Sequence, residues 1–157
     1  MLLMYSFVLP LHSLIRWAVL LTGLWAAYRG ISGVRRRRPW TLADERAGMW
    51  FTISLDTQFL LGLLLYFLLS PITKAAMHDF GAAMANPGMR FWAVEHITGM
   101  FIAAGLAHVG RNKIHKTGSD DRRHRTAAIF FTLSILAILA SIPWTGLPYG
   151  RPLLRLP

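Results

Sequence analysis

The sequence predicts an all-α fold, a four-transmembrane-helix, up-down antiparallel bundle that forms a single membrane domain over residues 1–157. Three observations predict it. The chain of 157 residues is 54% apolar with a mean hydropathy of +0.42, which is high for a soluble domain. Its apolar residues gather in four runs, each long enough for an α-helix to cross a hydrocarbon core about 30 Å thick. None of the runs shows the period-two alternation that a membrane β-barrel needs.

The four predicted helices cover about residues 5–28, 49–70, 91–109 and 127–144. Tyrosine and tryptophan residues lie near their ends, where amphipathic rings favour the headgroup region. Pro71 directly follows the second run, and the residue before a proline is disfavoured in a helix. The fourth run holds no ionisable side chain, so we expect it to form scaffold and lipid-facing wall.

The charge distribution predicts the orientation. The chain has 17 Lys and Arg against 7 Asp and Glu, a net charge of +10, which in a soluble protein would suggest nucleic-acid binding. Here the connections 29–48 and 110–126 hold most of the basic residues, whereas the connection 71–90 and the tail, with Arg151 and Arg155, hold few. The positive-inside rule therefore places the first and third connections in the cytoplasm and both termini on the outer, periplasmic side of a bacterial inner membrane. We expect the lipid bilayer, and no nucleic acid, as partner.

Ionisable groups inside membrane helices are costly and by default mark sites. The predicted helices contain His12, Arg16, Asp56, Glu95, His96 and His108, and the uncharged polar Gln58. His12 lies 17 residues before Arg29 and His96 lies 15 residues before Arg111. At 1.5 Å per residue the two imidazoles differ in depth by about 3 Å. On helices that run in the same direction, this pair matches the two axial ligands of one haem iron.

Other interpretations of the histidines stay open. His12 and His96 can instead hydrogen-bond between helices, or form a transition-metal site with His78 or Glu95. No other helix supplies a histidine at the depth of His108, so its role and that of His78 are undetermined, and the sequence predicts one haem.

Three further polar residues have candidate roles. Arg16 can form an ion pair with Asp56, or line a quinone pocket together with Gln58. Arg90, just outside His96, is placed to neutralise haem propionates, although an ordinary interfacial arginine is the alternative.

Several segments carry a resemblance to a known group of proteins. They include LHSLIRW (residues 11–17), the run from Asp56 to Pro71, RFWAVEHITGM (90–100) and HVGRNK (108–113). In these segments the chain resembles small bacterial four-helix integral membrane proteins of the cytochrome b or cytochrome b-like type. The resemblance implies a b-type haem held by His12 and His96 and a role in membrane electron transport.

The leading hypothesis is an integral membrane b-type cytochrome with one bis-His haem near the outer face, passing electrons between quinol and a respiratory or photosynthetic partner. The chain has no cysteine, so the haem would be bound non-covalently. One alternative is a haem-free accessory or anchor subunit of a larger membrane complex. Another is a copper-handling membrane protein that uses His12, His78, Glu95, His96 and Met100. A stand-alone enzyme is not expected.

Overall fold

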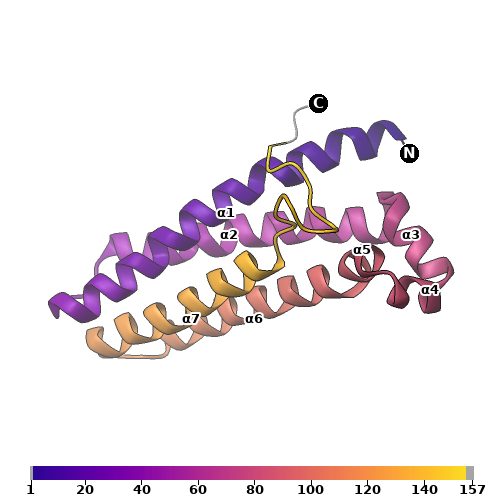
Figure 1. The fold of residues 1–157 in the computed structure, drawn as a ribbon. Coiled ribbons are helices and arrows are strands. Elements are labelled where there is room, and N and C mark those ends of the chain that lie inside the picture. The colour runs from indigo at the N-terminus through magenta and orange to yellow at the C-terminus, as the bar shows by residue number, and fades with distance from the viewer. Residues whose placement is uncertain (1, 155–157) are drawn as a thin grey trace.

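The computed structural model describes residues 2–154 of the chain, and it is helical without strands in that range. The prediction of an all-α fold is therefore confirmed for the described residues (Figure 1). Arg155, one of the two basic residues of the predicted outer tail, lies outside them.

Four long helices lie side by side. They are α1 (Leu2–Arg36), α2 (Leu42–Leu64), α6 (His96–His115) and α7 (Asp120–Ser141). Helix α1 packs against α2 and α7, and α6 packs against the same two helices, so α1 and α6 face each other diagonally (Figure 1). The α2–α6 seam is packed less closely than the other three neighbouring pairs.

Two π-helical turns extend the bundle at one end. The turn η1 (Leu65–Leu69) continues α2, and η2 (Phe91–Glu95) leads into α6. The connection between them forms three short helices, α3 (Pro71–His78), α4 (Phe80–Ala85) and α5 (Pro87–Arg90). The side chains of Ser70, Asp79 and Asn86 accept hydrogen bonds from the first turns of these helices, which is how short polar side chains satisfy free backbone N–H groups.

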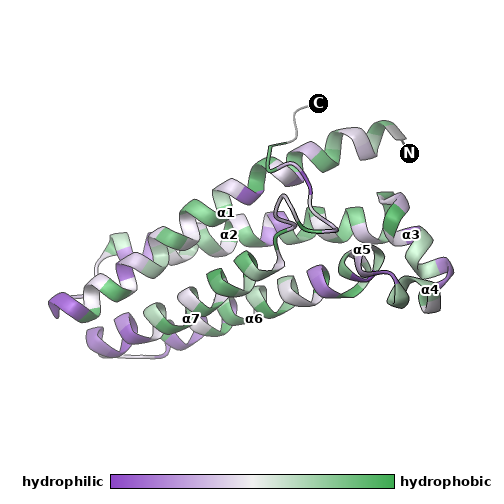
Figure 2. Ribbon diagram, viewed as in Figure 1, coloured by the Kyte–Doolittle hydropathy of each residue, from purple (hydrophilic) through white to green (hydrophobic). Residues whose placement is uncertain are grey.

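Three segments are long and apolar enough to cross a membrane, namely Leu3–Arg36, Leu42–Leu69 and Asp120–Ser141. The third predicted span, 91–109, coincides with η2 and the first part of α6, which does not meet this criterion in the described chain. Hydrophilic residues gather at the end of the bundle where α1 and α6 end and α7 begins (Figure 2).

The helices extend beyond the predicted runs at this hydrophilic end. Helix α1 continues to Arg36, and α7 already begins at Asp120. Between α1 and α2, the buried carboxylate of Asp44 accepts hydrogen bonds from Arg29 Nε at 2.8 Å and from Arg38 Nη1 at 2.7 Å. The backbone N–H of Thr41 also donates to Asp44, at 2.8 Å. This network fixes the turn between the two helices.

The core is built from aliphatic, aromatic and small residues of α1, α2, α6 and α7. Phe51 and Phe131 meet edge to face at 5.7 Å and are almost fully buried. Gly30 brings α1 so close to α7 that a Cβ atom there would lie 2.5 Å from the backbone nitrogen of Ala128. Small residues at such contacts let membrane helices approach closely.

Candidate functional site

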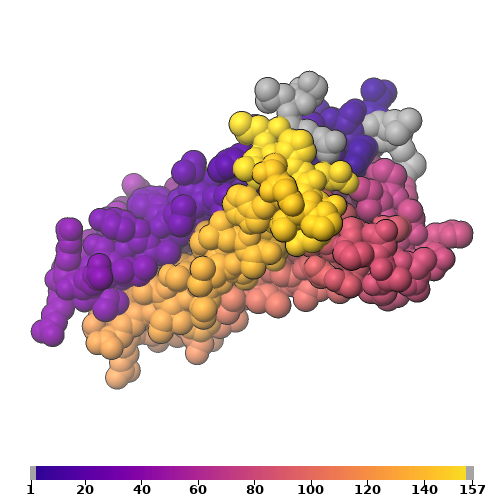
Figure 3. All heavy atoms as spheres, viewed as in Figure 1, coloured from indigo at the N-terminus to yellow at the C-terminus, as the bar shows by residue number. Residues whose placement is uncertain are grey.

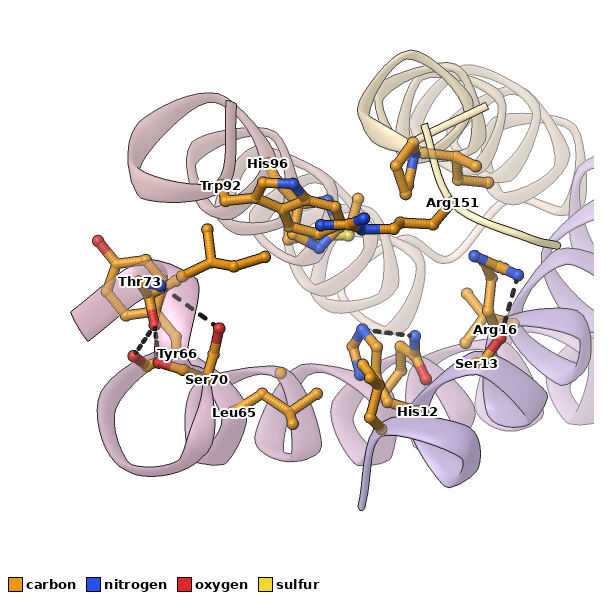
Figure 4. Close-up of a pocket in the computed structure, with 18 of the residues that line it drawn as sticks. His12, Ser13, Arg16, Leu65, Tyr66, Ser70, Thr73, Trp92, His96 and Arg151 are labelled. Carbon is orange, nitrogen blue, oxygen red and sulfur yellow. Dashed lines mark hydrogen bonds between the residues drawn. The ribbon is translucent and has the colours of Figure 1, made fainter. Parts of the chain in front are cut away.

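A cavity of about 130 Å³ lies inside the bundle, near the end that carries the short helices (Figure 4). Side chains of α1, α2, η1, α3, η2, α6 and α7 line it, together with Pro143, Arg151 and Pro152 of the C-terminal segment. Figure 3 shows this segment in yellow, lying across the bundle beside α1 and α7. A second cavity of about 40 Å³ lies between α2 and α6. His12, Gln58 and His96 line both cavities.

The imidazoles of His12 and His96 meet across the bundle. Their centroids lie 6.5 Å apart and their planes make an angle of 73°. A metal–imidazole bond is about 2.0 to 2.1 Å long and a ring nitrogen lies about 1.1 Å from the ring centre, so two imidazoles on opposite sides of one metal have centroids about 6.3 Å apart. The separation of the two ring centroids is thus close to the value expected for two imidazoles that would hold one metal between them.

The ring of His96 is held by the backbone and by aromatic neighbours. Its Nδ1–H donates a hydrogen bond to the carbonyl oxygen of Ser141 at 2.7 Å. Because a carbonyl oxygen only accepts, this bond places the proton on Nδ1 and leaves the Nε2 lone pair free. Phe91 and Trp92, from η2, lie 5.8 Å and 5.5 Å from the ring, and Phe91 stacks on Tyr149. A π-helical turn that shapes a functional site is a recurrent arrangement.

Among the described residues, the ring of His12 forms its one hydrogen bond with a side chain. Its Nε2 lies 3.2 Å from the amide nitrogen of Gln58, which donates the hydrogen bond, so Nε2 presents its lone pair. The buried Nδ1 has no hydrogen-bond partner among residues 2–154. On the neighbouring helix α2, Gly62 leaves room for the ring, because a Cβ atom there would lie 3.2 Å from His12 Cε1.

Two arginines give the main cavity a positive charge. Arg16 donates hydrogen bonds to Ser13 Oγ at 3.3 Å and to the carbonyl oxygen of Leu153, while its buried Nε has no partner in the described chain. The guanidinium of Arg151 lies 5.7 Å from the centre of the Trp92 ring. In Figure 4 both arginines lie on the same side of the cavity. No aspartate or glutamate of the described residues lines it.

The structure brings together some of the predicted site residues and separates others. His12, His96, Arg16 and Gln58 all line the main cavity. Arg90 does not, because it is exposed and forms an ion pair with Glu95 at 2.7 Å. His78 also lies outside this lining.

The predicted approach of Arg16 to Asp56 was wrong. Asp56 instead contacts His108 on the α2–α6 seam, with Nε2 and Oδ1 2.7 Å apart. This contact also gives His108 a partner that the sequence did not identify. Arg151 was missed as a site residue, since its only signal was a basic charge in a tail with few such charges.

The residues of the cavity fit a haem. The Nε2 lone pair of His96 is free, that of His12 becomes available when the bond from Gln58 opens, and two arginines of the lining can bind carboxylates. A porphyrin brings its own four equatorial nitrogens, whereas a bare metal ion needs more donors from the protein. Within residues 2–154 no group of three or more His, Cys, Asp or Glu side chains is placed to hold a metal ion.

Comparison with protein-family models, with curated proteins and with solved structures finds no match for this chain.

Proposed function

We propose that this protein is an integral membrane b-type cytochrome that binds one non-covalent haem between His12 and His96 and transfers single electrons. The observation that carries the proposal is the 6.5 Å separation of the two imidazole centroids across the main cavity. Bis-His coordination is typical of electron-transfer haems, because both axial positions are filled by the protein. This role is that of an electron carrier or complex subunit rather than of a stand-alone enzyme.

The side chains of the cavity have separate tasks in this proposal. His12 and His96 hold the iron, and Arg16 and Arg151 bind the propionate carboxylates of the haem. When bound, the haem supplies a reversible one-electron change at iron, whose potential depends on burial and on nearby charge. The positive charges of both arginines favour the reduced form of the haem, so they raise its reduction potential. Arg90, paired with Glu95 outside the cavity, has no direct part in binding.

A membrane quinol is the proposed electron donor, and a respiratory or photosynthetic protein is the proposed acceptor. Apolar helix surfaces support a donor that arrives through the bilayer, since large apolar side chains are exposed along α1, α2, α6 and α7. Arg16 and Gln58 line the same cavity as the two histidines. They therefore belong to the haem site, and a quinol would deliver its electrons at the edge of that site.

The membrane topology is also part of the proposal. All four long helices cross a bacterial inner membrane as an up-down antiparallel bundle, with the first and third connections in the cytoplasm and both termini outside. The gathering of hydrophilic residues at one end of the bundle supports this orientation (Figure 2). The histidine pair then lies nearer to the outer face, because its cavity adjoins the short helices at the other end.

The test is the absorbance of the purified protein from haem-replete cells, recorded as a reduced-minus-oxidised difference spectrum. A b-type signal is expected in the wild type, and its loss or broadening in His12→Ala and His96→Ala. His108→Ala is the matched control, since this histidine lies in the same bundle but outside both cavities. A flat spectrum of the wild type contradicts the proposal. Copper in the pure protein, or co-purification with large partners and no cofactor, would support the two alternatives instead.

A further inference from the structure

The two histidines differ in how the protein holds them. We propose, on the basis of the haem site above, that His96 is the permanent axial ligand and that His12 is an exchangeable one. A small diatomic ligand of the carbon monoxide or nitric oxide type takes its place, and Gln58 donates a hydrogen bond to that ligand. The protein then has a second activity, reversible binding of such a ligand, in addition to electron transfer.

His96 has the supports that a permanent ligand needs. Its Nδ1–H donates to a backbone carbonyl, and two aromatic rings of η2 flank its imidazole. The carbonyl group belongs to Ser141, whose hydroxyl donates to the carbonyl oxygen of Ala137 at 2.8 Å. A partner of this kind on the second ring nitrogen fixes the tautomer and raises the basicity of the ligating nitrogen. His96 can bind a metal through Nε2 without losing any hydrogen bond.

His12 lacks these supports. Its one hydrogen bond in the described chain uses Nε2, the same nitrogen that would bind the iron, and its Nδ1 has no partner. Ligation by His12 therefore breaks the bond from Gln58 and gains no compensating bond on Nδ1. Loss of such a partner typically lowers metal affinity by about 10- to 100-fold. We expect the bond between His12 and the iron to be weaker than that of His96 by a factor in this range.

Gln58 is placed to stabilise either state of the site. Its side chain is buried, and its amide nitrogen lies 3.2 Å from His12 Nε2. When His12 is free, the amide holds the ring through Nε2. In this proposal, when a ligand takes the place of His12, the same amide donates its hydrogen bond to that ligand. Its Oε1 atom has no partner among the described residues.

The smaller cavity offers space for a ligand of this size. Its volume of about 40 Å³ is bounded by His12, Gln58, Phe59, Ile97 and other side chains of the α2–α6 seam. By comparison, a cavity volume of about 10 to 15 Å³ is enough to hold one water molecule. The wall contains mostly apolar side chains, which suits a small neutral molecule that partitions into the membrane.

The experiment adds carbon monoxide to the dithionite-reduced, haem-loaded wild type in detergent and follows the absorbance spectrum. We expect carbon monoxide to convert the spectrum of the wild type to that of a carbon monoxide complex. The His12→Ala variant should keep its haem and should bind carbon monoxide at a concentration about tenfold or more lower than the wild type needs. Gln58→Leu should weaken binding about three- to tenfold, since it removes the donor to the ligand and releases His12 for the iron. His96→Ala should lose most of the haem, and His108→Ala should behave like the wild type.

Several outcomes would overturn the inference. A wild-type spectrum that carbon monoxide leaves unchanged contradicts it, and this measurement requires no variant to fold. Equal loss of haem from His12→Ala and His96→Ala, with native helix content by circular dichroism in both, contradicts it as well. In these cases the haem of the wild type remains and the proposed cytochrome stands. Absence of haem from the wild type overturns both proposals together.

Discussion

His108 Nε2 lies 2.7 Å from Asp56 Oδ1 and joins α6 to α2 through two side chains that are each about half exposed, at 52% and 46%. The same seam holds an ion pair between Arg111 and Glu45 at 3.1 Å and a hydrogen bond from Arg111 to Thr52 at 3.2 Å. Phe59 and Phe101 also meet edge to face across this seam, with ring centroids 4.8 Å apart, so polar and aromatic contacts together join the two less closely packed helices.

A double-mutant cycle of Asp56→Ala and His108→Ala measures this link. We expect a coupling free energy of about 0.6 kcal/mol, the average value for polar contacts between membrane helices. The readout is the free energy of unfolding in detergent. Additive effects of the two substitutions would show that the contact contributes nothing.

Removal of the buried carboxylate between α1 and α2 should be far more damaging. Asp44→Ala is expected to lower the free energy of unfolding by about 3 kcal/mol, because the side chain of Asp44 is 1% exposed and its loss leaves two arginines without their partner. The control is Asp121→Ala, which removes an exposed pair with Arg125 and should change stability by less than about 1 kcal/mol. Similar losses in both variants would contradict the prediction.

Two glycines inside helices should respond to alanine in opposite directions. At Gly30 a Cβ atom would meet backbone atoms of Ala127 and Ala128 at 2.9 Å and 2.5 Å. Backbone atoms cannot turn aside, so Gly30→Ala should push α1 from α7 and cost about 1 to 3 kcal/mol. At Gly105 no heavy atom lies within 4 Å of the added carbon, and Gly105→Ala should stabilise by about 0.5 to 1 kcal/mol. Thermal unfolding in detergent gives both values.

The proposed haem site makes a prediction about two arginines. Arg151→Ala should increase the rate of haem loss to apomyoglobin about tenfold, because Arg151 lines the cavity and a charged hydrogen bond contributes roughly 1.5 to 3 kcal/mol. Arg90→Ala removes the same charge from an exposed pair with Glu95, and should leave the rate within about twofold of wild type. Equal rates for the two variants would assign the propionates to other groups.

The helices themselves were predictable from the sequence, but their ends were not. A membrane-length apolar run is a strong signal, and the predicted run 49–70 ends within one residue of η1, although α2 already begins at Leu42. Hydropathy describes where a side chain prefers to lie and says nothing of backbone conformation. Helix α1 therefore runs on to Arg36 and α7 begins at Asp120, since both helices continue into polar sequence.

The candidate site likewise contains some residues that the sequence could predict and others that it could not. The similar depth of His12 and His96 could be predicted from the sequence, because depth along a helix follows from a constant rise per residue. The pairing of Asp56 with His108 depends instead on how α2 is rotated about its axis, and depth alone does not give that rotation. Arg151 lies in a segment without helical periodicity, whose course is fixed by hydrogen bonds from Arg16 and Trp17 to the carbonyl oxygen of Leu153.

That C-terminal segment has a consequence for the order of assembly in the cell. Pro143, Arg151 and Pro152 form one wall of the main cavity, and they leave the ribosome after all four long helices. Without them the main cavity lacks this wall and one of the two arginines that line it. For the proposed haem, we therefore expect stable retention in the cavity only after this segment has docked.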